Sequence, residues 1–204
     1  MVYYMNRFFK YALTTLCVAT SSTAIAADWT PVFKSWENGC NSSSVEDSLL
    51  ESLGYDYFDS DAYFEAFDNN GFFKLAGQKN HAKLQKLFTN NAAKQGKYPK
   101  VKLPYRNDLG KAVLSRDNEG NIEISIPLSH AKLYNHSIVK YTRYFVPDTG
   151  VLGQYITFGA MSNADYQKLK QIKMKKSTGD DLEYRASFNK DSKGTVTLVC
   201  DFST

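Results

Sequence analysis

The chain has 204 residues, of which 43% are hydrophobic, with 25 basic and 21 acidic side chains. This length supports one domain with a hydrophobic core. The first 26 residues hold two of the basic side chains, so the rest of the chain is nearly neutral and a nucleic-acid partner gains no support from charge.

Residues 1–26 are predicted to be a signal peptide. Arg7 and Lys10 form a basic start, residues 11–19 are mainly apolar or small, and Ala-Ile-Ala at 24–26 suits a signal peptidase. Cleavage is predicted after Ala26, which leaves residues 27–204 as a single α+β domain. The leader is too short to span a bilayer and no later stretch is long and apolar enough, so we expect a periplasmic or secreted protein with no membrane span.

The first half of the mature chain is predicted to be helical. A short aromatic segment at 28–39 is expected to pack on the domain. Ser43 and Glu46 have the spacing of a capping box, and apolar residues recur every four positions, which predicts a helix over 44–53. Further helices are predicted at about 61–67 and 78–93, followed by a surface connection over 95–108 with an extended piece at 100–103.

The second half predicts an antiparallel sheet. Residues 122–128 alternate apolar and polar side chains, as in a strand with one buried face. Other strands are predicted at 111–115, 138–146 and 151–158, then a helix from 162 to about 175, then a C-terminal β-hairpin pairing 182–188 with 196–202. This order predicts an α+β fold, with N-terminal helices packed on a mainly antiparallel sheet.

Cys40 and Cys200 are the two cysteines that follow the leader. One pair of cysteines in an exported chain predicts a disulfide, and Cys200 is placed on the apolar face of its strand. An alternative remains, because Cys40 directly precedes a serine-capped helix and a helix N-terminus lowers a thiol pKa. Cys40 would then be the nucleophile of a cysteine hydrolase, with His130 or His136 as its base.

His130 and His136 lie on either side of Tyr134 and give a further alternative. Two imidazoles could bind zinc, or haem together with a tyrosine, which would make the protein a haem or metal carrier. The third histidine of the chain, His81, is distant in sequence. We therefore predict no metal site and no cofactor.

Residues 41–73 are the strongest compositional anomaly, with eight acidic residues and no lysine or arginine. Exposed aromatic rings act as binding anchors, and surrounding acids steer a basic partner. The predicted partner-binding residues, called the acidic-aromatic stretch below, are Tyr57, Phe58, Asp59, Asp61, Tyr63, Phe64 and Glu65.

These features predict an exported cell-envelope binding protein that acts by protein–protein interaction and not by catalysis. Its most concrete form is an inhibitor or immunity-type protein that neutralises a toxin or hydrolase. The expected partner is a basic protein of the cell envelope.

Overall fold

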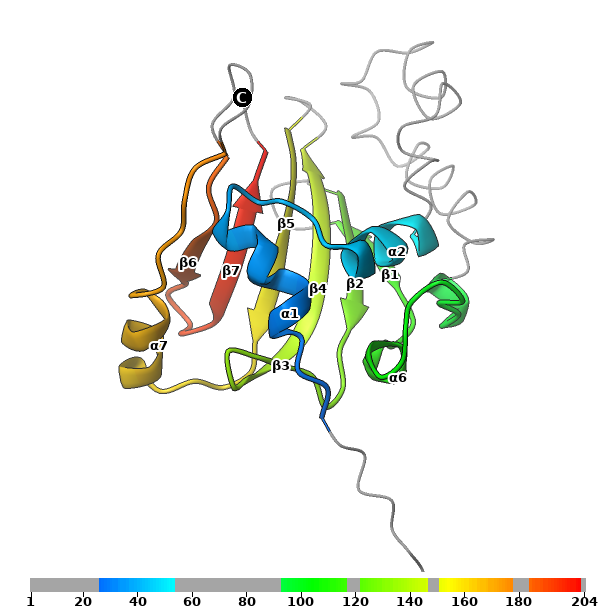
Figure 1. Ribbon diagram of the computed structural model, residues 1–204, viewed down its shortest axis with the longest axis horizontal. Coiled ribbons are helices and arrows are strands. Elements are labelled where there is room, and N and C mark those ends of the chain that lie inside the picture. Colours follow the sequence, from blue (N-terminus) through cyan, green and yellow to red (C-terminus); the bar gives the residue numbers. More distant parts are fainter. Residues whose placement is uncertain (1–25, 54–92, 117–121, 147–150, 178–183, 203–204) are drawn as a thin grey trace, which may run out of the picture.

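The computed structural model describes residues 26–53, 93–116, 122–146, 151–177 and 184–202 (Figure 1). The helical elements there are α1 (Thr30–Phe33), η1 (Lys34–Glu37), α2 (Ser44–Ser52), η3 (Ala93–Gln95), α6 (Tyr105–Asp108) and α7 (Asn163–Leu169). The strands are β1 (Val113–Arg116), β2 (Ile122–Pro127), β3 (Lys132–Leu133), β4 (His136–Val146), β5 (Val151–Phe158), β6 (Ser187–Lys190) and β7 (Val196–Asp201).

The strands form a seven-stranded antiparallel sheet in the order β1-β2-β4-β5-β7-β6, with β3 paired to the start of β4. Figure 1 shows α1 and α2 in front of this sheet, so the molecule has a helical layer on one sheet face. The predicted α+β fold, with N-terminal helices on a mainly antiparallel sheet and a C-terminal hairpin, is confirmed.

Strand register sorts the side chains onto two faces. Ile126 pairs with Tyr141, Tyr141 with Ile156, and Ile156 with Leu198, and all four are fully buried. This row lies on the face that the helices cover, called the helical face here. The neighbouring row on the other face contains Ser125, Thr142, Tyr155 and Val199. The alternation that predicted half-buried strands is therefore present across the sheet.

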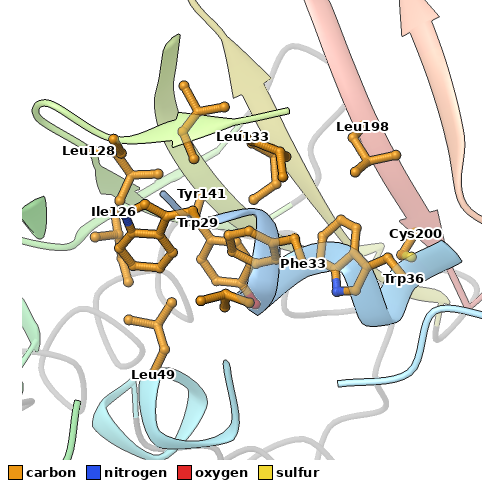
Figure 2. Packing of buried hydrophobic residues seen from close by; sticks show 14 of the residues in the cluster. Trp29, Phe33, Trp36, Leu49, Ile126, Leu128, Leu133, Tyr141, Leu198 and Cys200 are labelled. Carbon is orange, nitrogen blue, oxygen red and sulfur yellow. The ribbon is translucent and has the colours of Figure 1, made fainter. Parts of the chain in front are cut away.

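An aromatic row from the N-terminal segment fills the space between the layers. Trp29, Phe33 and Trp36 follow helical spacing, so they lie on one side of α1 and η1. All three are fully buried, and the Phe33 ring stacks on Tyr141 with centroids 5.8 Å apart. Figure 2 shows the row between Leu49 of α2 and the sheet residues Leu133 and Leu198. Each aromatic pair adds about 0.5–1.5 kcal/mol beyond the burial of its area.

The predicted helix over 44–53 is confirmed as α2, and Ser43 caps it by accepting a hydrogen bond from the Glu46 backbone N–H at 3.2 Å. The predicted strands at 111–115, 122–128, 138–146 and 151–158 correspond to β1, β2, β4 and β5. The predicted helix at 61–67, and all of that at 78–93 except its last residue, lie outside the described residues.

Three local predictions are wrong. The C-terminal hairpin forms, but its first strand, β6, covers Ser187–Lys190 and not 182–188, and residues 184–186 form no strand. The helix that begins after Ser162 ends at Leu169 and not near residue 175, because the chain turns away to pair with the N-terminal segment. There the Lys175 N–H donates to the Glu37 carbonyl at 2.8 Å, and the Gly39 N–H donates to the Lys175 carbonyl at 3.1 Å. No strand forms over 100–103, where the chain turns and Arg106 donates to the carbonyls of Val101 and Pro99.

Candidate functional site: buried acids, the disulfide and the tyrosine face

Cys40 and Cys200 form a disulfide that joins the start of the domain to β7, with their Cα atoms 5.7 Å apart. Gly39 and Cys40 both have positive φ, at 75° and 60°, and this turn separates η1 from α2. Both cysteines are buried, and Cys200 pairs in register with Gln154 of β5. The Cys40 sulfur is bonded here, so it is not a free thiolate in this form of the protein.

The two histidines occupy different surroundings. His130 is exposed in the loop between β2 and β3, where its charge lowers the pKa of Asp108. His136 is the first residue of β4, and its charge lowers the pKa of Asp165 near the start of α7. Between them, the Tyr134 hydroxyl donates to a Glu37 carboxylate oxygen at 2.9 Å. The structure therefore associates each of these three side chains with a different carboxylate.

Glu46 is a fully buried carboxylate at the first turn of α2. The Trp36 indole N–H lies 3.1 and 2.9 Å from its two oxygens, and the Ser43 backbone N–H and the Gln154 side-chain amide also donate to it. The contact with Ser43 completes a reciprocal capping box. Burial raises the pKa of Glu46 to about 8, against the lowering effect of these donors.

The polar contacts of Glu46 continue into the sheet. The Tyr141 hydroxyl donates to Gln154 Oε1 at 2.7 Å, and both side chains are buried. Burial also raises the pKa of Tyr141, and the charge of Glu46 adds to the effect. This hydrogen-bonded chain of Trp36, Glu46, Gln154 and Tyr141 connects the helical layer to β4 and β5. This network is buried, and together with the disulfide it links the helical layer to the sheet.

Asp108, the last residue of α6, is a second buried acid that accepts a hydrogen bond from a tryptophan indole. It is 4% exposed, and the Trp29 indole N–H donates to its Oδ2 at 2.9 Å. Its carboxylate also accepts the backbone N–H of Ala27. Burial raises the pKa of Asp108, while these two donors and the charge of His130 oppose the rise.

The sheet face opposite the helical face carries an ordered set of polar and aromatic side chains, called the tyrosine face here. Tyr144 on β4 extends across Gly153 of β5 and bonds Asp201 of β7. Tyr155 on β5 extends across β4 in the opposite direction, and its hydroxyl donates to Glu123 Oε1 of β2 at 2.6 Å. The two rings lie 6.1 Å apart at a tilt of 40°.

Each tyrosine covers the strand that it crosses. Beneath the Tyr144 ring, Gly153 has no side chain, and an added Cβ would overlap the ring. Thr142 is fully buried and bonds Ser125 at 2.9 Å between the two hydroxyl oxygens. Lys140 places its ammonium 5.4 Å from the centroid of the Tyr155 ring. Both tyrosines remain partly exposed, so this face presents rings that are already fixed in position.

The acidic-aromatic stretch lies outside the described residues, so its predicted role stays a prediction. Sequence reasoning identified Glu46 as a capping residue but missed its bond to Trp36. The requirement of a buried indole N–H for an acceptor was an available signal, although it does not name the acceptor. The tyrosine face could have been found, because alternation in β4 and β5 places Tyr144 and Tyr155 opposite the buried Tyr141 and Ile156.

Among the helices at described positions, none combines the length and apolar character needed to cross a bilayer. Within the same ranges, no group of three or more histidine, cysteine, aspartate or glutamate side chains is arranged to hold a metal ion. The chain matches no protein-family model, no curated protein and no solved structure.

Proposed function

We propose that this is an exported binding protein that acts by protein–protein interaction, with the tyrosine face as a principal contact surface. Its most concrete form is an inhibitor or immunity-type protein that neutralises an envelope toxin or hydrolase. The observation that carries the proposal is the pair of crossed, hydrogen-bonded and partly exposed tyrosines, Tyr144 and Tyr155.

The disulfide supports export. Disulfides persist in oxidising compartments such as the periplasm and the extracellular space, and are rare in the cytosol. The Cys40–Cys200 bond joins parts of the chain that are 160 residues apart, so it links the N-terminal segment of the described fold to its last strand. The predicted signal peptide over 1–26 accounts for delivery to such a compartment.

The chemistry of the tyrosine face supports a protein as the partner. Tyrosine offers a large rigid contact area with few torsions to immobilise, and it is enriched at binding hot spots. Hydrogen bonds to Glu123 and Asp201 already restrict the two rings, so less entropy is lost on binding. Lys140 adds a positive charge over the Tyr155 ring, and a surface of mixed charge suits a protein better than a polyanion.

The acidic-aromatic stretch remains the second proposed contact, and its acids would accelerate association with a basic partner. The two surfaces make separable contributions. Truncating a ring on the tyrosine face should act mainly on dissociation, whereas reversing Asp61 or Glu65 should act mainly on association and its dependence on salt.

The test begins with affinity capture from envelope extract, followed by binding kinetics of variants against the captured protein. Tyr155→Ala or Tyr144→Ala should weaken binding about 30-fold, the equivalent of a hot-spot loss of roughly 2 kcal/mol. Leu103→Ala is the matched control, since Leu103 is 64% exposed and lies outside this face. Unchanged binding of both tyrosine variants would place the interface elsewhere, and loss of stability alone would make the rings structural.

A further inference from the structure

Asp108 receives two hydrogen bonds from the beginning of the domain. One comes from the Trp29 indole at 2.9 Å and the other from the backbone nitrogen of Ala27. Both donors are neutral in the uncleaved chain. Asp108 is 4% exposed, and among the described residues its two donors are neutral and the charge that lowers its pKa belongs to the exposed His130. Its carboxylate therefore retains much of its desolvation cost.

The nitrogen of Ala27 is held firmly in place. The Lys132 N–H donates to the Ala27 carbonyl at 2.9 Å, and the Trp29 N–H donates to the Lys132 carbonyl at 2.6 Å. These bonds fix the segment beside β3, and Ala27 is 4% exposed. Chain ends are poorly ordered unless they are tied down in this way.

The bond between Ala26 and Ala27 is also the one that the sequence predicts to be cleaved. Hydrolysis adds one water: the leader departs with a carboxylate on Ala26, and the new amine on Ala27 takes up a proton at neutral pH. The nitrogen that already donates to Asp108 thereby becomes an ammonium group. Charge-assisted hydrogen bonds are roughly twice as strong as neutral ones, and a buried carboxylate gains a counter-charge.

We propose that Asp108 is the binding site for the α-ammonium group of Ala27, formed when the leader is removed. Cleavage then completes the core, because it creates an ion pair between the first residue of the mature chain and α6. The precursor, which lacks this pair, is folded less stably than the mature protein. The inference rests on the export that is part of the proposed function.

The test compares three forms of the domain: one that begins at Ala27, one that begins at Ala26, and one that begins at Ala27 with an acetylated amine. The acetylated form keeps an N–H at the same nitrogen and removes only the charge. The free Ala27 form should melt higher than both others, by on the order of 10 °C for a buried ion pair in a domain of this size. Equal melting temperatures of the free and acetylated forms would overturn the proposal.

Asp108→Asn serves as the second arm. This near-isosteric change keeps an acceptor for Trp29 and removes the negative charge, so the advantage of the free amine should disappear. An advantage that persists in Asp108→Asn would assign the ammonium group to another partner and overturn the proposal. If Asp108→Asn does not fold, the comparison between free and acetylated amines still decides.

These outcomes are distinct from those of the binding test, since melting temperature needs no partner. Intact mass of the exported protein supplies a final check. A mature chain that begins at Ala27 is required, and any other start overturns the ammonium site while leaving the tyrosine face open to its own test.

Discussion

The Trp36 indole N–H lies within hydrogen-bonding distance of both carboxylate oxygens of Glu46, at 3.1 and 2.9 Å. Trp29, seven residues earlier, makes the corresponding bond to Asp108 at 2.9 Å. The two tryptophans thus fasten the N-terminal segment to two separate helices, α2 and α6, through buried acids. Loss of either acid would leave a buried indole N–H without that acceptor.

The first prediction concerns pH. Burial raises the pKa of Glu46 from 4.5 to about 8, so the folded state binds this proton more tightly than the unfolded state. Its stabilising contribution is complete below about pH 4.5 and is lost as pH rises towards 8, at up to about 1.4 kcal/mol per pH unit. Denaturant unfolding between pH 5 and pH 8 should show the decline.

Glu46→Gln is the control for this prediction, because it keeps the shape and one acceptor but does not titrate. Its stability should fall less with pH than that of the natural chain. The difference between the two curves isolates Glu46 from Asp108, whose raised pKa acts in the same direction. Parallel curves would mean that Glu46 stays ionised throughout, with its three hydrogen-bond donors offsetting its burial.

The second prediction concerns the disulfide. It closes a loop of 160 residues, for which the chain-entropy treatment gives a stabilisation of roughly 4–5 kcal/mol. Reduction, or replacement of both Cys40 and Cys200 by alanine, should lower the free energy of unfolding by an amount approaching this value. The double variant should be insensitive to reductant. A natural chain whose unfolding midpoint does not respond to reductant would contradict the prediction.

The third prediction concerns Gly39. Its φ is 75°, and an added Cβ would overlap the backbone of Ser177. Gly194 also has a positive φ, 86°, but its nearest neighbour is Lys190 Cε at 3.8 Å. Gly194→Ala should cost about 1–2 kcal/mol from backbone conformation alone. Gly39→Ala should cost about 1–3 kcal/mol more because of the overlap, as measured by denaturant unfolding. Equal losses would show that the 170–177 segment moves aside easily.

Elements set by interactions between residues close in sequence could be predicted, whereas features set by residues far apart in sequence could not. Period-two alternation and the Ser43 cap depend on near neighbours, so β2, β4, β5 and α2 were placed correctly. The end of α7 was not, since the chain beyond it is held by hydrogen bonds between Lys175 and both Glu37 and Gly39, which lie more than 130 residues earlier. Asp108 and Trp29 are also far apart in sequence, by 79 residues, so no local pattern reveals that pair.

The last prediction concerns the support of the tyrosine face. At Gly153 an added methyl group would overlap the end of the Tyr144 side chain and not backbone, so the ring should move and the fold should persist. Gly153→Ala should cost about 1 kcal/mol and break the bond between Tyr144 and Asp201. Burial and Asp201 together raise the pKa of Tyr144 to about 12, so ultraviolet titration should show one tyrosine shifting to a lower pKa in the variant.

Gly159→Ala is the matched control, because its nearest contacts, at 3.4 Å to Ser137, are ordinary and its φ is not positive. That variant should be neutral or slightly stabilising. If Gly153→Ala leaves the tyrosine titration unchanged yet weakens binding to the captured partner, Tyr144 is not the ring that Gly153 positions, and the contact lies on the β5 backbone itself.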